Sequence, residues 1–452
     1  MIDMSVAVSS SPKKYILLVL PLILLAVGLN QIGWQVAVSL ALFCIFYVTL
    51  NRFAWVLLVL APLGLLLGSV LHIEIRPNWL YDMSIGEVFV MTSFLSLFLD
   101  VLFGIRSTLR ISLLGWILVL YVIAALCSVF YVSDYPLFVA GMKVLVLSIM
   151  SYLSALNLFD TKSKIKTFCS SLVIFTAVLS LQIFYLFFKS GFSPAIFFDR
   201  SSIVFPFGAL ALVTASIAFL VPLLFSLSLH YKHTEKISFF SALVAIIGVV
   251  AVFASLGKAA ALSLVIGLIL LFWHFKQQRI IMALLVLFFV ITSVSFLSPY
   301  VQGFWERLAR ISIDSTTSFR IEEYEVAARL ILDNPVKGLG IGEQLNQYQR
   351  LLHPDYSELA NNYFLQAGMD LGFIGITILA FIILLILGLA VKLNKLRTLP
   401  IASGLAISII IALVNGLFEV TIFALQYAII FWLVVGMSSR IRKDKLLYEP
   451  KS

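Results

Sequence analysis

Four cationic side chains stand where an apolar chain accommodates charge least easily. Arg200, Lys258 and Arg320 lie in or beside polar breaks between apolar runs, and Lys143 lies inside such a run. A charge at the membrane boundary is costly, so each needs a partner or a function. Arginine binds phosphate through two parallel hydrogen bonds and lysine binds it as a point charge, which predicts an anionic ligand. A lipid-linked diphosphate fits best, because its tail lies in the bilayer and its head group at the surface.

Each of the three outer cations also has a purely structural explanation. Arg200 can pair with its neighbour Asp199, and Arg320 can pair with Glu323 or Glu325 on its own helix. The aliphatic stem of Lys258 can carry the ammonium group towards water. The prediction of an anion site therefore rests on the three outer cations together, with Lys143 as a weaker fourth.

One histidine lies in a polar segment. His353, in LLHPDYSE, could act as a general base or contact a sugar, and could equally be a solvated loop residue. The sequence contains no HExxH, GxSxG, Walker or dinucleotide-binding motif. The glycine-rich stretch at 338–343 lacks the strand before it and the helix after it that a phosphate-cradling loop needs. No metal site or cofactor is expected.

The composition is that of a membrane protein. The chain has 452 residues, of which 62% are hydrophobic and 12% are charged. Soluble domains are about half apolar and about a quarter charged. The net charge of +9 does not predict nucleic-acid binding, because the cations punctuate apolar runs instead of forming one basic stripe.

The apolar runs divide the chain into about fourteen membrane spans. A spanning helix needs about 20 apolar residues, and polar breaks mark its ends. The predicted spans are 15–29, 33–50, 53–71, 84–104, 111–132, 137–157, 168–189, 203–229, 237–255, 259–275, 280–298, 371–391, 399–417 and 421–438. The fold class expected is an all-α integral membrane protein.

The distribution of lysine and arginine predicts the orientation. With a cytoplasmic N-terminus, the short outer segments hold four cations, Arg76, Lys189, Arg200 and Lys258. The inner segments hold 20: Lys13, Lys14, Arg52, Arg106, Arg110, Lys162, Lys164, Lys166, Lys232, Lys236, Lys276, Arg279, Lys392, Lys395, Arg397, Arg440, Arg442, Lys443, Lys445 and Lys451. Cytoplasmic loops carry the excess of Lys and Arg, so both termini are predicted to be cytoplasmic.

The longest polar segment, 299–370, is predicted to be a helical loop on the outer side. Ile321, Tyr324, Ala328 and Ile331 recur with the period of an amphipathic helix, which Asn334–Pro335 ends. A glycine-rich turn follows. Two further helices are expected, Glu343–Leu352 and Leu359–Met369, the second leading into the next span. Loops of this length in compact proteins are usually functional unless they are disordered.

Two stretches resemble a known superfamily. RIEEYEVAARLILDNPVKGLGIGEQL and ANNYFLQAGMDLGFIGITILAFIILLIL resemble the shared region of the O-antigen ligase and O-antigen polymerase (Wzy-type) superfamily. The matching positions are Asn334, Pro335, Gly338, Gly340, Asn362, Leu365, Gly372 and Gly375. Arg200 with Pro206 and Gly208 resembles another arginine-bearing span of the family, and Ser255-Leu256-Gly257-Lys258 resembles its Ser-Arg-Gly turn. The specific part covers roughly 195–390.

Two positions depart from the family pattern. Asn361 stands where the family has histidine, and Lys258 stands where it has arginine. The ligases of the superfamily rely on that histidine, whereas asparagine can neither act as a base nor become positively charged. This departure favours a polymerase over a ligase.

The resemblance implies a metal-independent membrane glycosyltransferase of GT-C-like architecture. It would transfer a glycan from undecaprenyl diphosphate to a lipid-linked repeat unit on the periplasmic side of the bacterial inner membrane. Arg200, Arg320 and Lys258 would hold the diphosphate, with Lys143 as a further candidate. Glu358, Asp355 or His353 would deprotonate the acceptor hydroxyl. Substrate contacts would come from Asn361, Asn362, Tyr356 and Tyr363, the two tyrosines stacking on sugar rings.

Two other functions stay open from the sequence. An O-antigen ligase would move finished glycan to a lipid A core or another acceptor, and a flippase or transporter would move the lipid-linked glycan without chemistry. A flippase is expected to carry charges along a central cavity and often shows repeated halves. Besides membrane lipids and the lipid-linked glycan, a chain-length regulator is a possible partner in polymer synthesis; nucleic acid is not.

We divide the chain accordingly into four regions. Residues 1–190 form N-terminal spans, and 191–298 form the spans of the ligase- and polymerase-like core. Residues 299–370 form the outer helical loop, and 371–452 the C-terminal spans and tail.

Overall fold

The chain folds into a bundle of apolar helices. The computed structural model describes residues 53–76, 79–106, 108–190, 203–231, 236–275, 315–352, 360–396 and 399–444. Eleven of the predicted spans fall on described residues, and each coincides with a helix. The other three, 15–29, 33–50 and 280–298, lie outside them. The all-α membrane fold is therefore confirmed for the described part of the chain.

The helices in chain order are Phe53–Leu65, α3 (Ile85–Leu102), α4 (Leu113–Cys127), α5 (Tyr135–Leu158), α6 (Lys162–Lys189), α7 (Leu210–His230), α8 (Lys236–Ala254), α9 (Lys258–His274), α12 (Ser315–Asp333), α13 (Glu343–Leu351), α14 (Tyr363–Asn394), α15 (Pro400–Asn415) and α16 (Leu425–Asp444). Short 3-10 turns are η1 (Ser128–Phe130) and η4 (Thr421–Phe423). Among the described residues, seven helices are long and apolar enough to cross a membrane.

Two predicted spans begin or end differently from the apolar pattern. The helix from Phe53 stops at Leu65, and the strand β1 (Ser69–Arg76) then pairs antiparallel with β2 (Trp79–Ser84). The span predicted from 203 starts at Leu210, because β3 (Val204–Phe205) and β4 (Gly208–Ala209) make a tight hairpin first. The β3–β4 hairpin is built from apolar residues, so composition alone extends the predicted span through it. The span predicted from 53 ends at 71, within β1.

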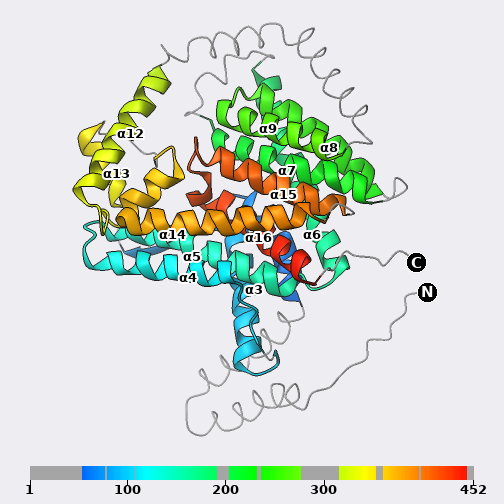
Figure 1. Ribbon diagram of the computed structural model, residues 1–452, viewed down its shortest axis with the longest axis horizontal. Coiled ribbons are helices and arrows are strands. Elements are labelled where there is room, and N and C mark those ends of the chain that lie inside the picture. Colours follow the sequence, from blue (N-terminus) through cyan, green and yellow to red (C-terminus); the bar gives the residue numbers. More distant parts are fainter. Residues whose placement is uncertain are drawn as a thin grey trace.

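Helix α14 crosses the middle of the view in Figure 1, between α15 and α4. It packs against α4 and α15, while α5 packs along α16 and α7 packs against α8 and α15. Small residues permit the closest approaches: a Cβ on Gly404 of α15 would lie 2.9 Å from the carbonyl oxygen of Pro222 in α7. Several buried hydroxyls donate to carbonyl groups of their own helix, as Thr176 does to Leu172 O at 2.8 Å. Such packing is expected of helices that lack a polar face.

The helix ends fall into two groups that match the predicted alternation across the membrane. At one end Arg106 donates to Asn157 O at 3.0 Å, and His274 lies 2.6 Å from the hydroxyl of Ser403. All four residues were predicted at or near inner ends of spans. The loop helices α12 and α13 lie together at the other end, beside the start of α14 (Figure 1).

Candidate functional site

Arg320, one of the predicted anion ligands, is fixed by the loop that follows α15. Its Nη2 donates to Glu419 Oε1 at 3.0 Å, and its Nη1 donates to the carbonyl of Phe418 at 3.2 Å. Burial opposes the guanidinium charge, yet the carboxylate of Glu419 outweighs it and raises the pKa of Arg320 above its ordinary value. The side chain is 37% exposed. A firmly charged, accessible guanidinium therefore stands at this end of the bundle.

Asn361 is held by α12 through both of its donor groups. Glu323 is fully buried, and its Oε1 accepts from the Asn361 backbone N–H at 2.7 Å. Its Oε2 accepts from Asn361 Nδ2 at 2.9 Å, and Tyr324 donates its hydroxyl to Asn361 O at 2.9 Å. We call Arg320, Glu323, Tyr324, Asn361 and Glu419 the Arg320 cluster. It joins three segments that are far apart in the sequence.

The residues after Asn361 tie the cluster to α14. Asn362 caps this helix, because its Oδ1 accepts from the N–H groups of Phe364 at 2.8 Å and Leu365 at 3.2 Å. Its Nδ2 donates to Leu417 O at 3.0 Å, and Tyr363 N–H donates to Gly416 O at 3.1 Å. Asn362 and Tyr363, both predicted to contact substrate, thus also anchor the loop that carries Glu419.

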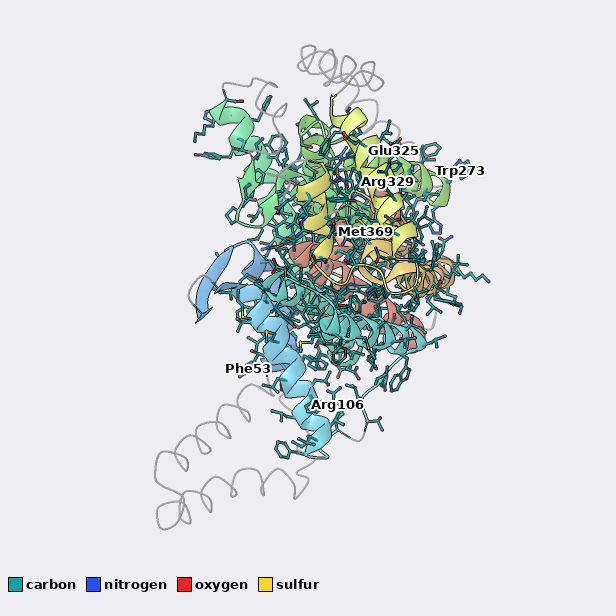
Figure 2. The ribbon with its side chains drawn as sticks, turned by 90° about the vertical axis from the view of Figure 1, so that its left-hand side faces the viewer. Phe53, Arg106, Trp273, Glu325, Arg329 and Met369 are labelled. Atoms are coloured by element: carbon teal, nitrogen blue, oxygen red, sulfur yellow. The ribbon has the colours of Figure 1, made fainter. Side chains whose placement is uncertain are left out.

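The amphipathic helix of the loop is confirmed, but its buried face differs from the predicted one. Of the apolar series, Ile321 is exposed. The buried residues are Glu323, Ala327, Leu330 and Ile331. The face is rotated because Glu323 turns inward to bind Asn361. Figure 2 looks onto the end of the molecule that α12 covers, with the exposed Glu325 and Arg329 on this helix.

The glycine-rich turn docks onto a kink in α14. The boundary expected near residue 371, between a loop helix and the next span, is present as a kink in α14 at Leu371 and Gly372, where the backbone leaves helical geometry. Leu339 N–H donates to Met369 O at 2.6 Å, and Phe373 N–H donates to Pro335 O at 2.7 Å. Gly338 has φ +66°, and a Cβ there would lie 2.6 Å from Leu371 N. The turn shapes the site and does not cradle a phosphate.

The start of α13 is hydrogen-bonded to the segment that follows α4 and η1. Ser133 donates its hydroxyl to both carboxylate oxygens of Glu343 at 2.8 Å. Tyr131 donates its hydroxyl to Lys337 O at 2.7 Å, and the Lys337 ammonium lies 5.2 Å from the centre of the Tyr131 ring. The loop is therefore ordered against the bundle over its described residues, as its helical pattern predicts.

Lys143 has a buried partner that the sequence did not indicate. Its ammonium lies 2.6 Å from Glu87 Oε2, with the two side chains 11% and 3% exposed. Glu87 also accepts from the Ser84 N–H at 3.1 Å and completes the capping box of α3. The structure thus gives Lys143 a structural role, namely the joining of α5 to α3.

Lys258 begins α9, immediately after a strained turn. Leu256 has φ 55° and is, among the described residues, the one non-glycine residue with positive φ. Such backbone costs about 1–3 kcal/mol and persists where the surroundings impose it. Lys258 is partly exposed. Arg200, His353, Tyr356 and Glu358 lie outside the described residues, so the convergence of Arg200 and Lys258 with Arg320 stays a prediction.

Sequence reasoning missed the acidic members of the site. Glu419 lies between the last two predicted spans, in NGLFEVTIF, and an isolated acid beside apolar runs is itself a signal. Glu323 was considered only as an ion-pair partner of Arg320. Asp370 was not considered at all, although it is an acid at the start of a span and is 3% exposed.

Comparison with known proteins supports the resemblance noted in the sequence. Residues 242–380 match the family model described as O-antigen ligase. The match includes Lys258, Arg320, Asn361 and the kink of α14, whereas Arg200 and Glu419 lie outside it. A search of curated proteins finds no match. Over residues 242–380, this multi-spanning membrane protein is therefore similar to the family described as O-antigen ligase.

Proposed function

We propose that the protein is a polysaccharide polymerase. It transfers a glycan from undecaprenyl diphosphate to the terminal sugar of a lipid-linked repeat unit on the periplasmic side of the inner membrane. The observation that carries this proposal is the Arg320 cluster, which lies at the end of the bundle where the charge distribution predicts the outer surface. Its members other than Glu419 fall within the family match. A charged guanidinium there suits the diphosphate of the donor and the charge that develops on it as the glycosidic bond breaks.

The residue type and the hydrogen bonds of Asn361 favour the polymerase over the ligase. Ligases of the superfamily rely on a histidine at this position, and here an amide donates through both its side chain and its backbone to Glu323. This amide can neither take nor give a catalytic proton. A ligase remains the second candidate, because the matching family model is described as O-antigen ligase.

Two residues of the cluster are unsuited to act as the general base. Both oxygens of Glu323 already accept hydrogen bonds from Asn361. Burial raises the pKa of Tyr324 above its ordinary value of 10.0, which keeps its hydroxyl protonated at neutral pH. The base proposed for the acceptor hydroxyl is therefore still Glu358, Asp355 or His353, in the segment next to Asn361.

The first experiment compares Arg320→Ala with Arg329→Ala in a strain that lacks the chromosomal copy of the gene. Arg329 lies on the same helix and is exposed, so its loss controls for a change of charge on α12. Removing one group that stabilises developing charge lowers rates roughly 10²–10³-fold. Arg320→Ala should therefore reduce chain extension to single repeats at wild-type protein levels, while Arg329→Ala keeps long chains, as measured by gel electrophoresis of extracted glycan.

The outcomes separate the candidate functions. Long chains in the deletion strain would exclude a polymerase. Long polymer that remains on its carrier lipid in that strain would identify a ligase instead. Repeat units confined to the cytoplasmic leaflet would point to a flippase. Wild-type chain lengths with Arg320→Ala would remove the proposed role of the guanidinium.

A further inference from the structure

A cavity lies beside the Arg320 cluster and is not used by the proposed donor site. Its volume is about 200 Å³, and α5, α13, α14 and the turn η4 enclose it. Most of its wall is apolar, formed by Leu137, Val144, Leu145, Ile341, Leu345 and Phe423. The remaining wall carries the side chains of Gln344, Gln366 and Asp370, three polar residues that are 2–3% exposed.

The polar part of the wall presents acceptors. Gln366 donates its Nε2 to Asp370 Oδ1 at 3.0 Å, and its Oε1 accepts from Ala360 N–H at 3.2 Å. Gly342 N–H also donates to the Asp370 carboxyl group. In contrast, Gln344 Oε1 is buried and has no hydrogen-bond partner among the described residues. A buried acceptor without a donor is costly, which indicates that something else supplies the hydrogen.

These features select a class of ligand. No lysine, arginine or histidine is among the described residues that line the cavity, and the carboxyl group of Asp370 would repel an anion. A purely hydrocarbon chain would leave Gln344 without a donor. A neutral ring with apolar faces and hydroxyl groups on its edge meets both requirements, because its faces pack on Phe423 and the aliphatic wall while a hydroxyl donates to the amide or carboxyl oxygens. A sugar residue has this chemistry.

The cavity and the Arg320 cluster share one backbone segment. Ala360 donates to Gln366 of the cavity wall, and the next residue, Asn361, donates to Glu323 of the cluster. Two subsites on either side of one short segment suit a reaction that joins two glycans.

We propose that this cavity binds the hydroxyl-bearing sugar of the acceptor, with Gln344 and Asp370 receiving hydrogen bonds from it. This inference rests on the proposed polymerase function and names the acceptor subsite of that reaction. Gln344 and Asp370 act here as binding and positioning residues.

The test uses the full-length protein in lipid nanodiscs, with native lipid-linked repeat unit as donor and a water-soluble, diphosphate-free glycoside of the same repeat as acceptor. Gln344→Leu removes the carboxamide, and Ala140→Leu narrows the mouth of the cavity from α5. Gln347→Leu is the matched control, because it makes the same chemical change on α13 at a position that does not line the cavity.

We expect Gln344→Leu to raise the KM for the soluble acceptor roughly tenfold, the equivalent of one hydrogen bond, with the KM for the donor unchanged. The apparent melting temperature of this variant should equal or exceed that of the wild type, since an unsatisfied polar group has been removed. Saturation-transfer NMR on the soluble glycoside gives a readout independent of turnover, and its signal should fall in Gln344→Leu and Ala140→Leu but not in Gln347→Leu.

Other outcomes overturn the inference. Unchanged acceptor KM and unchanged NMR signal in both variants would mean that the cavity holds water only. A rise in KM for the lipid-linked donor alone would assign the cavity to the isoprenoid chain. A wild-type protein that transfers no glycan at all would instead refute the proposed function.

Discussion

Glu323 is a carboxylate that the protein buries completely and that accepts hydrogen bonds from both donor groups of Asn361. Burying a charge is costly unless hydrogen bonds replace the lost water, and here Asn361 provides two of them, from its backbone and from its side chain. Asparagine suits this task because its amide nitrogen offers donors directly beside the backbone N–H. The residue that departs from the family pattern is thus the one that Glu323 requires.

At the residue scale, we predict that Glu323→Ala is strongly destabilising. The substitution leaves two buried donors of Asn361 without acceptors, each worth about 1–3 kcal/mol, so a loss of about 2–6 kcal/mol is expected. Thermal unfolding in detergent measures it. Glu325→Ala is the control, since Glu325 is exposed on the same helix and its loss should change stability by less than about 0.5 kcal/mol. Equal melting temperatures for the two variants would contradict the assigned role.

The partners of single residues show where sequence reasoning ends. Arg320 was identified from its type and its position beside apolar runs, which are properties of the local sequence. Its partner Glu419 lies 99 residues further along, and only tertiary packing brings the two together. The same holds for Lys143 and Glu87, 56 residues apart by their numbers, which meet because α3 packs on α5.

Lys143 provides a test of structural against functional charge. Removing one partner of a buried ion pair typically costs about 3–5 kcal/mol, because it leaves the other charge uncompensated. Lys143→Met should therefore lower the melting temperature markedly, and the double variant Glu87→Gln/Lys143→Met should restore most of it. Glutamine also preserves the capping box at the start of α3.

Chain extension in the double variant separates the two explanations. A stable double variant that makes long chains assigns Lys143 to structure. A stable double variant that makes only single repeats would assign it to the substrate, as the sequence predicted. A wild-type melting temperature for Lys143→Met alone would show that the pair contributes nothing.

At the element scale, α14 is the piece on which the site is assembled. Its kink at Leu371 and Gly372 receives the turn from Pro335 to Gly340, and its N-terminal cap at Asn362 holds the loop of Glu419. The sequence placed a boundary between a loop helix and a span near residue 371, and the backbone leaves helical geometry at that point. The kink follows from tertiary contacts, because the backbone of the turn bonds to carbonyl and N–H groups that a straight helix would bond internally.

Gly338→Ala and Gly372→Ala should each disrupt this junction. Both glycines have positive φ, and a Cβ at Gly372 would collide with the carbonyl of Pro335. Strain and collision together should cost more than about 2 kcal/mol and reduce chain extension in proportion. Gly388→Ala is the matched control on the same helix, because no atom lies within 4 Å of the Cβ position there. Thermal unfolding measures the effect, and equal melting temperatures for all three variants would contradict this assignment.

The spans themselves were predictable because length and apolarity determine them. Eleven predicted runs coincide with helices, since a chain this apolar has few other ways to satisfy its backbone. The β3–β4 hairpin was not predictable from the same signal, because the residues in Val204–Ala209 are as apolar as those of a span. Its turn and the start of β4 contain Pro206 and Gly208, which a span also tolerates.

At the scale of the whole molecule, the helix ends form two groups. Each hydrogen bond between helix ends described above joins two ends that were predicted to lie on the same side of the membrane. The group with Arg106, Asn157 and His274 contains the ends predicted to be cytoplasmic. The group with Tyr131, Glu343 and Asn361 contains those predicted to face the periplasm. The contacts establish the grouping, and the charge distribution predicts which group faces which side.

Reporter fusions test that assignment. A reporter that is active only outside the cytoplasm should be active when fused after Gln347, in α13, and silent when fused after Ser163, in the first turn of α6. The physical reason is the excess of lysine and arginine in the segments of the first group, which is predicted to be cytoplasmic. The reverse pattern would mean that the protein has the opposite orientation in the membrane. Equal reporter activity at both positions would contradict the alternation of spans.

The bond between Ser133 and Glu343 has a consequence for how the protein is made. The two residues lie 210 positions apart. At ~5–20 residues per second, Glu343 leaves the ribosome roughly 10–40 s after Ser133. Through that interval the early helices hold their place in the bilayer before the segment that covers them exists. Glu343, which is synthesised late, then binds Ser133, which was synthesised early. A truncated product would therefore contain the spans of α4 and α5 without the loop helices α12 and α13.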